Sequence, residues 1–574
     1  MIAIDFETYY DADCTVKGLG PDAYSRHPQF DPYMVSIYGD GFDYVGPTQD
    51  APWCDLPVEP KLVAHNAAFD SVCFQAAQRM GMIPGDLAPV WSCSANLAVY
   101  IQCPRNLKGF AEQMLGVKPD KTVRDKMKGK LPKDLDDTQL TSLIEYARMD
   151  SVLCNKLWET YEKHWPYHEQ VIARHTMTSG QKGVHIDQDL LTRGLEQLYE
   201  VKEKSAKLVP WVGDDEPVNS LKQLKIFCAK EGIPAPSSTN QTDPACAEWE
   251  SQYGKKYPVV GALRDWRKSN RLLRIFETVQ TRLREDGSLP FGLKYFGAAL
   301  TGRWSGDTGL NMQNLPRGKS FGIDTRSLFV PRPGKKFVIC DLAQIEPRCL
   351  AWLVNDTALL DIVKSGKDIY TAHAMATMGA KRVSKSMRQL AKIRVLGLGY
   401  GCGHKKFKEI AAGWGIPLTS SEAQHTVSEY RRTNPKVVWF WKNCEKDMAN
   451  DHGEHHFLEL PSGRTISYFN VDRDRGQMVA SITRGENPRY WYGGKICENI
   501  VQATAREVFA ECYYNIIRAG YEVLWTVHDE LIVEVDQNDT DSIKDIEDMM
   551  SRTPEWLKGC PIAAEAHEAD KYMK

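Results

Sequence analysis

Residues 336–348 read KFVICDLAQIEPR. Within them, Phe337 to Cys340 form an apolar run with β-branched members, preceded by two prolines and a glycine, and this pattern predicts a buried strand. Asp341 follows the run, so its carboxylate would stand at the end of a rigid element, at the edge of a sheet. An Asp in such a place is also typical of a simple turn or cap, and these residues alone leave both interpretations open.

Residues 523–535, VLWTVHDELIVEV, hold a second group of acids. The apolar runs on both sides predict two strands, with His528, Asp529 and Glu530 between them in a tight hairpin, although the Asn-Gly or Asp-Gly of the strongest hairpin turns is absent. Acids presented from two sheet edges suit a two-metal phosphoryl-transfer site, because hard cations such as Mg²⁺ prefer oxygen ligands on stiff supports.

Three separate stretches among the first 150 residues carry further acids. Asp5 and Glu7 follow an apolar strand and would point to the same face of it. Asp70 closes a segment that runs from an apolar strand into a helix start, and Tyr146 and Asp150 lie four residues apart in a helical pattern, so they share a helix face. Each acid alone is typical of a solvated surface, whereas the ordered set favours a single site.

These stretches resemble known motifs. Residues 341–348 resemble motif A, and residues 527–530 resemble motif C, of family A (DNA polymerase I-like) DNA polymerases, while the N-terminal set resembles the three motifs of the DEDDy 3′–5′ exonucleases. The resemblance implies two Mg²⁺ ions per site, with Mn²⁺ as an alternative, and a role for Tyr146 in orienting the attacking water. The implied metal ligands are Asp341, the Leu342 carbonyl and Asp529 for polymerisation, and Asp5, Glu7, Asp70 and Asp150 for the exonuclease.

Residues 388–401, RQLAKIRVLGLGYG, repeat functional side chains every four positions. Arg388, Lys392, Leu396 and Tyr400 would form one helical face, and an amphipathic helix with exposed bases is the alternative interpretation. The stretch resembles motif B of the fingers. That implies that Arg388 and Lys392 bind the triphosphate, that Lys392 protonates the leaving pyrophosphate, that Leu396 packs on the sugar and that Tyr400 stacks at the templating pair.

Motif A adds two more nucleotide contacts by resemblance. Glu346 would pack under the sugar and exclude a 2′-OH, and Gln344 would also contact the nucleotide. Pro347 departs from the family pattern, and we expect it in the first turn of a helix, where a proline costs little.

Two loop motifs, TGRWS at 301–305 and NMQNLP at 311–316, are similar to motifs of the same family. They imply DNA contacts by Arg303, Gln313 and Asn314, of which Arg303 and Gln313 would reach the minor groove, whose acceptors are shared by all correct base pairs.

Four more residues are predicted to contact DNA. Gln502 and His528 are implied by the resemblance, although Ala503 and Arg506 near Gln502 depart from the family pattern. Arg267 and Lys268 belong to a basic helical stretch, 264–274, which is either a solvated face or a thumb helix laid along phosphates.

The resemblance covers nearly the whole chain and implies an α/β and α+β multidomain fold. An RNase H-like exonuclease domain would precede a right-hand polymerase. The expected parts are residues 1–170 for the exonuclease, 171–300 for the start of the polymerase region and the thumb, 301–362 for the first part of the palm, 363–435 for the fingers and 436–574 for the second part of the palm.

The implied function is template-directed addition of dNTPs to a primer 3′ end, with 3′–5′ proofreading, in viral or phage DNA replication. Primer–template DNA and dNTPs would be the partners, with replication-fork proteins in addition. The competing hypothesis is a 3′–5′ exonuclease whose C-terminal half is a non-catalytic DNA-binding module, and the intact acids and cations of the polymerase motifs argue against it.

The amino-acid composition limits which other classes of protein the chain could belong to. The 574 residues are 42% hydrophobic and 26% charged, with a formal net charge of −3, so the chain is not a polycation and any basic groove must be local. Its 15 cysteines include no C-x-x-C pair, which argues against a zinc site or a disulfide framework. No apolar run reaches membrane-spanning length and no signal peptide is evident, so we expect a cytoplasmic protein, in the host cell if it is viral.

Overall fold

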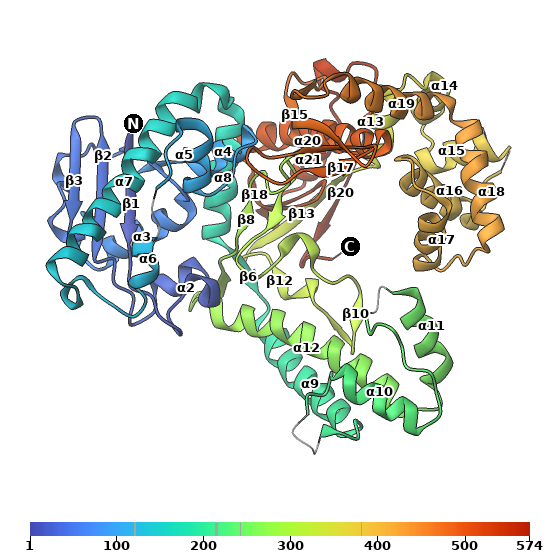
Figure 1. The fold of residues 1–574 in the computed structure, drawn as a ribbon, viewed down its shortest axis with the longest axis horizontal. Helices are drawn as coiled ribbons and strands as arrows, with labels where there is room; N and C mark the ends of the chain where they lie inside the picture. Colours follow the sequence, from blue (N-terminus) through green and yellow to red (C-terminus); the bar gives the residue numbers. More distant parts are fainter. Residues whose placement is uncertain (120–121, 213–215, 241–242, 380–381, 574) are drawn as a thin grey trace.

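The computed structural model describes residues 1–119, 122–212, 216–240, 243–379 and 382–573. An N-terminal α/β part, a central sheet and two groups of helices that project from it in different directions make up the molecule (Figure 1). The mixed α/β class expected from the sequence is therefore observed. Within the described ranges, none of the helices combines the length and the hydropathy that a membrane span requires.

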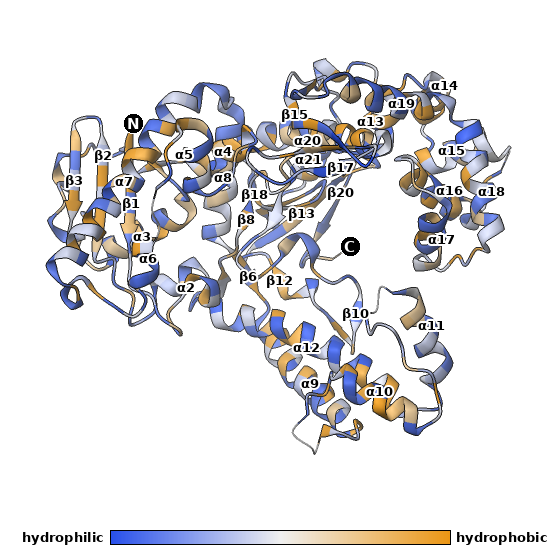
Figure 2. Ribbon diagram, viewed as in Figure 1, coloured by the Kyte–Doolittle hydropathy of each residue, from blue (hydrophilic) through white to orange (hydrophobic). Residues whose placement is uncertain are grey.

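The N-terminal part is built on a five-stranded mixed sheet in the order β3-β2-β1-β4-β5. The first strand pairs antiparallel with β2 and parallel with β4, so it lies at the centre of the sheet. Apolar residues concentrate on these strands, which explains their burial beneath the surrounding helices (Figure 2). The strands are β1 (Ile2–Glu7), β2 (Met34–Gly39), β3 (Phe42–Gly46), β4 (Lys61–Ala64) and β5 (Val90–Cys93).

Seven helices accompany this sheet in the described part of the N-terminal region. The longest, α7, starts with a capping box between Asp136 and Gln139. The helices are α1 (Val16–Leu19), α2 (Pro21–Ser25), α3 (Ala67–Arg79), α4 (Ser94–Tyr100), α5 (Leu107–Leu115), α6 (Thr122–Lys126) and α7 (Asp137–Tyr161).

The central sheet is antiparallel throughout, in the order β18-β19-β13-β20. The predicted strand before Asp341 is confirmed as β13 (Lys335–Leu342), and the predicted hairpin is confirmed as β18 (Glu522–Val527) and β19 (Glu530–Asp536). Pro347 lies in the first turn of α13 (Ile345–Leu353), as expected. The remaining elements around this sheet are α20 (Gly493–Arg518), α21 (Ser542–Met550) and β20 (Ala564–Ala569).

One helical group consists of α9 (Gln188–Lys207), α10 (Leu221–Lys230), α11 (Pro244–Tyr253) and α12 (Pro258–Arg282). The long helices α9 and α12 approach closely, because a Cβ at Gly194 would lie 2.3 Å from the ring of Phe276. Hydrophilic and hydrophobic residues alternate along α12, as expected for a helix buried on one face (Figure 2). Three short strands, β6 (Val184–Ile186), β7 (Ser288–Leu289) and β12 (Phe329–Val330), form a small sheet at the base of this group.

The other group follows α13 in the chain and ends before a second antiparallel sheet, β14-β15-β16-β17, which the sequence analysis did not predict. The amide of Gln102, from the N-terminal part, bonds both the N–H and the carbonyl of Ser467 in this sheet. The group is α14 (Thr357–Lys364), α15 (Ile369–Met378), α16 (Lys385–Leu398), α17 (His404–Gly413), α18 (Ser420–Thr433) and α19 (Pro435–Asn450), and the sheet is β14 (His456–Glu459), β15 (Thr465–Asp474), β16 (Gln477–Ser481) and β17 (Arg489–Trp491).

Helix α8 (Tyr167–Lys182) connects the N-terminal part to the rest of the chain through a buried ion pair. Glu169, in its first turn, receives two hydrogen bonds from Arg506 of α20, and both side chains are 1% exposed. Tyr295 donates a further hydrogen bond to Glu169 Oε2 at 2.6 Å. Burial alone would raise the pKa of Glu169, but the Arg506 charge and these hydrogen bonds hold it below its ordinary value.

We predict that Glu169→Gln strongly destabilises the protein. The substitution removes the carboxylate that binds Arg506 through two hydrogen bonds and leaves it, among the described residues, only the carboxylate of Glu507, at 3.2 Å, and removing one partner of such a buried pair costs about 3–5 kcal/mol. Urea unfolding monitored by tryptophan fluorescence measures the effect. Glu200→Gln, which removes a surface partner of Lys204, is the matched control and should shift the midpoint little. Equal midpoints for the two variants would contradict the prediction.

Candidate active sites

The five N-terminal residues predicted to act together line one cavity of about 370 Å³. Strand β1 supplies Asp5 and Glu7, the first turn of α3 supplies Asp70, and one face of α7 supplies Tyr146 and Asp150. Parallel pairing of β1 with β4 explains the convergence, because β4 leads directly into α3 beside the end of β1.

Electrostatic repulsion and burial shape this cavity. Burial, together with a smaller contribution from the Asp150 charge, raises the pKa of Asp70 to about 7, against the lowering effect of the Phe6 amide that donates to its Oδ1 at 3.2 Å. Burial likewise raises the pKa of Tyr146, with contributions from the charges of Asp150, Glu7 and Asp5. The site therefore gathers negative charge that burial disfavours, and a bound cation would offset that cost.

The second group of acids meets at the end of the central sheet. Asp341 of β13 lies opposite Glu530 of β19, and the Leu342 amide donates to the Asp529 carbonyl at 3.0 Å. His528 and Asp529 form a two-residue turn between β18 and β19, in which His528 has a φ of 57°. A non-glycine residue in the left-handed region is unusual and is often found where function requires it. Glu530 lies buried beneath the turn and accepts a hydrogen bond from Tyr572 at 2.9 Å.

Three predicted residues from three segments join beside this turn. Glu346, in the first turn of α13, pairs with Arg303 and accepts a hydrogen bond from the Tyr400 hydroxyl at 3.0 Å. Arg303 also lies 3.9 Å from Asp529. Glu346 therefore links the loop of Arg303 to the end of motif B, directly next to a predicted metal ligand.

The loop that carries Arg303 is held by two arginines that the sequence analysis did not select. Arg506 donates to the Gly302 carbonyl at 3.0 Å, and Arg464 donates to the carbonyls of Leu300 and Thr301 at 3.1 and 3.3 Å. Arg464 is paired in turn with Glu507 at 2.8 Å. In the sequence, Arg506 stands out only because it departs from the family pattern. That departure is the signal that could have pointed to its role in holding the loop.

The predicted nucleotide-binding face is only partly helical. Helix α16 presents Arg388, Lys392 and Leu396, but it ends at Leu398, so the expectation that Tyr400 shares the helical face is wrong. Gly399 and Gly401 explain the early end, because glycine disfavours a helix and Gly401 adopts a φ of 77°. Tyr400 instead follows the helix and reaches Glu346.

Both cations of α16 have protein partners in this structure. Arg388 bonds Asp368 at 3.1 Å and lies over the Tyr370 ring. Lys392 lies 5.0 Å from the ring centroid of Trp414 and 5.8 Å from that of Tyr370. The Gln344 side chain, on a residue with a φ of 52°, accepts a hydrogen bond from the first amide of α15, so it caps a helix.

The residues predicted to contact DNA differ in accessibility. His528 and Asn314 are exposed, whereas Gln313 is buried and its amide braces the hairpin, donating to the Thr526 carbonyl at 2.6 Å and accepting from the His528 amide at 2.7 Å. The others are half-buried with protein contacts: Gln502 to Glu498, Arg267 to the Thr239 carbonyl and Lys268 over the Phe321 ring. Their contact with DNA stays a prediction.

Both acid groups offer the oxygen ligands that Mg²⁺ or Mn²⁺ prefers, and a cation bound beside Asp70 would favour its ionised form against the effect of burial. In the described parts of the chain, however, no three potential ligands already stand at metal-binding spacing. The donor chemistry fits divalent cations, and the side chains would have to close around them.

The pKa of Asp70 leads to a prediction about stability without metal. Since the folded-state pKa is raised above its ordinary value of 3.8, ionised Asp70 disfavours the folded state, and this cost grows as the pH rises from about 4 to 7. Asp70→Asn should therefore raise the melting temperature in EDTA, and the gain should be larger at pH 8 than at pH 5. Thermal melts test this, with exposed Asp86→Asn as control. A gain that shrinks with rising pH would contradict the prediction.

Comparison with known proteins places this geometry in a family. The model of DNA polymerase family A matches residues 191–574. The chain is 25% identical to the DNA polymerase of Bacillus phage SP02 over 100% of this chain and 99% of that protein. It is 29% identical to DNA polymerase I of Aquifex aeolicus over 48% of this chain, and 26% identical to the thermostable DNA polymerase I of Thermus aquaticus over 70% of this chain.

The chain spans about half the length of those two DNA polymerase I relatives, 45% and 48% respectively. Among solved structures, the POL domain of Pol1 from M. smegmatis, in a complex with DNA primer-template and dNTP, aligns over 100% of this chain and 95% of its own with a TM-score of 0.71. At 17% sequence identity that likeness concerns the fold. Because the family model covers two thirds of the residues, the chain belongs to DNA polymerase family A.

Proposed function

We propose that this protein is a template-directed DNA polymerase that extends a primer 3′ end with dNTPs. The observation that carries the proposal is the meeting of Asp341 and the Asp529 turn at one sheet end, with Arg303, Glu346 and Tyr400 joined beside them. When bound there, divalent cations would activate the primer 3′-OH and stabilise charge on the phosphates.

The protein's own side chains would position the cations, the nucleotide and the DNA. Asp341, the Leu342 carbonyl and Asp529 would hold the cations, and Arg388 and Lys392 would bind the triphosphate, with Lys392 donating a proton to the leaving pyrophosphate. Arg388 would exchange Asp368 for the nucleotide, and Lys392 would leave the Trp414 ring. Arg303, Asn314, Gln502 and His528 would face the primer–template, and Gln313 would support them from beneath by holding the His528 turn.

We further propose a 3′–5′ proofreading exonuclease in the N-terminal cavity. Its support is the convergence of Asp5, Glu7, Asp70 and Asp150 on one 370 Å³ space, with Tyr146 beside Asp150 to orient a water molecule. We assign the exonuclease to residues 1–170, the thumb region to 171–300, the palm to 301–362 and 436–574, and the fingers to 363–435.

The full-length similarity to a phage DNA polymerase supports a role in phage replication. We propose action in the host-cell cytoplasm, on primer–template DNA with dNTPs and Mg²⁺, together with replication-fork proteins. The discriminating experiment is primer extension with Mg²⁺ and four dNTPs. Degradation without any extension would favour the alternative, an exonuclease with a non-catalytic DNA-binding half.

Polymerisation should depend on Asp341 and Asp529. Alanine at either position removes a cation ligand worth several kcal/mol, so extension should fall by roughly 10³-fold or more while single-strand degradation persists. Asp5→Ala with Glu7→Ala should give the reverse result. Single-turnover extension and degradation rates measure both. Asp536→Asn, at the exposed end of β19, is the control. Near-normal extension by Asp529→Ala would refute this polymerase site.

Sugar selection should depend on the bulk of Glu346. Glu346→Ala should raise ribonucleotide relative to deoxyribonucleotide incorporation, because the side chain that excludes a 2′-OH is gone. The substitution also releases Arg303 and Tyr400, so the ratio of the two kcat/KM values is the proper measure, since a general loss cancels in it. Glu346→Gln keeps the bulk and should keep the selection. An unchanged ratio in Glu346→Ala would exclude the role.

A further inference from the structure

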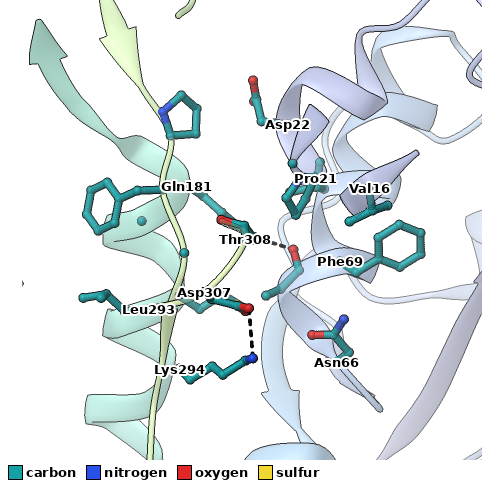
Figure 3. A pocket seen from close by; sticks show the side chains of 18 of the residues that line it. Val16, Pro21, Asp22, Asn66, Phe69, Gln181, Leu293, Lys294, Asp307 and Thr308 are labelled. Carbon is teal, nitrogen blue, oxygen red and sulfur yellow. Dashed lines mark hydrogen bonds and ion pairs between the residues drawn. The ribbon is translucent and has the colours of Figure 1, made fainter. Parts of the chain in front are cut away.

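A second cavity, of about 700 Å³, lies between the N-terminal part and the polymerase part. Figure 3 shows Val16, Pro21, Asn66 and Phe69 on one wall and Leu293, Lys294 and Asp307 on the other. Its size is within the range of small-molecule sites, about 300–1,000 Å³. It adjoins the exonuclease cavity, because both are lined by Val16, Lys17, Asn66, Phe69 and Arg124.

Arg282, the last residue of α12, lines this cavity and has an unusual environment. The side chain is only 5% exposed, and its Nε has no hydrogen-bond partner. In the described parts of the chain, its side chain donates one hydrogen bond, a long one of 3.4 Å to the Thr308 hydroxyl. Among the described residues, no carboxylate lies within ion-pair distance of Arg282, and burial lowers its pKa.

Two neighbouring cations differ from Arg282 in having acidic partners. Arg284 pairs with Asp22 at 2.5 Å. Lys294 pairs with Asp307 at 3.2 Å, as Figure 3 shows. Six basic and two acidic side chains line the cavity, and the two acids are those two partners. The lining is therefore positive overall.

Of the other cations, Lys17 and Arg124 are exposed, whereas Arg105 donates hydrogen bonds to Asn96 and to the Tyr295 carbonyl at 3.0 and 2.6 Å. Arg282 differs from them in being buried with a single long side-chain hydrogen bond among the described residues.

The backbone fits closely around the Arg282 guanidinium. A Cβ at Gly20, which has a φ of 79°, would lie 3.1 Å from Arg282 Cζ. On the other side, Thr308 and Gly309 adopt φ values of 54° and 83° in the turn that joins Asp307 to Leu310. The two glycines adopt these φ values without strain and leave room beside the guanidinium, and Thr308 is the non-glycine residue with a positive φ in this turn.

We propose that Arg282 binds a phosphate group of a nucleotide in this cavity. A buried guanidinium without a counter-ion is costly, and a phosphate provides the oxygens that its planar donors match. The proposal rests on the proposed exonuclease function for its choice of ligand. Two sources share the chemistry: the nucleoside monophosphate released by hydrolysis, and a phosphodiester of the single strand whose 3′ end lies at the exonuclease acids.

The test uses the full chain in EDTA, so that no hydrolysis occurs and binding is measured apart from catalysis. The variants are Arg282→Gln, Arg282→Lys and the control Arg193→Gln, an exposed arginine on α9. The probes are inorganic phosphate, dTMP and the 5′-phosphorylated trinucleotide of thymidine. Titration calorimetry gives the affinities, and thermal melts without ligand show whether each variant folds.

We expect Arg282→Gln to weaken binding of dTMP or of the trinucleotide by about 10- to 100-fold, because that is the size of effect expected for a hydrogen bond to a charged group. Arg282→Lys should have an intermediate affinity, and the control variant should bind as the wild type does. An effect on dTMP identifies the free mononucleotide as the source, and an effect on the trinucleotide alone identifies the phosphodiester. Without ligand, Arg282→Gln should melt no lower than the wild type, because a buried uncompensated charge is removed.

Equal affinities of Arg282→Gln and the wild type for every probe would overturn the proposal. So would binding of inorganic phosphate alone, equal in all variants, since that is adventitious anion binding. Degradation by the double variant Asp5→Ala with Glu7→Ala tests the exonuclease separately. Failure of the phosphate-binding proposal can therefore be told apart from failure of the exonuclease proposal.

Discussion

The buried pair between Arg506 and Glu169 is the constraint on which the relation between the two halves depends. Glu169 begins the helix that leaves the N-terminal part, and Arg506 lies on the longest helix behind the central sheet. The same guanidinium bonds the Gly302 carbonyl, so it also orients the loop of Arg303. Since a buried ion pair is stable only with good geometry, it restricts how the halves can be arranged. One apolar cluster continues through Trp158, Tyr295 and Trp304 around it.

The two acid sites have different electrostatic character. In the N-terminal cavity the acids lie near one another. Burial raises the pKa of Asp70, and the groups that shift this pKa include no cationic side chain. At the central sheet, Arg303 stands close to both Glu346 and Asp529, so part of the negative charge is balanced by the protein. At the central sheet, the charge balance depends on where Arg303 lies, and Arg464 and Arg506 hold the loop that carries it.

Several expectations from the sequence agree with the structure because they rest on local rules. The strand before Asp341, the hairpin around Asp529 and the shared helix face of Tyr146 and Asp150 follow from apolar periodicity and spacing. The helical position of Tyr400 was wrong because two glycines end α16 before it. The sheet β14–β17 was not predicted, although its strands pair in sequence order, and a bulge between Phe469 and Asp472 interrupts the alternation along β15. The bonds from Gln102 to Ser467, which join it to the N-terminal part, could not be predicted from local spacing.

The sequence by itself determined the family, the identity of the acids and the order of the motifs, since these depend on residue type and spacing along the chain. The tertiary structure decided which polar side chains form hydrogen bonds or ion pairs within the protein. Gln313 braces the hairpin, Gln344 caps a helix and Arg506 pairs with a residue 337 positions away. It also decided that Arg282 faces a cavity without a carboxylate partner in the described chain. Such partners are set by chain segments that meet only on folding, and no local pattern encodes their distances.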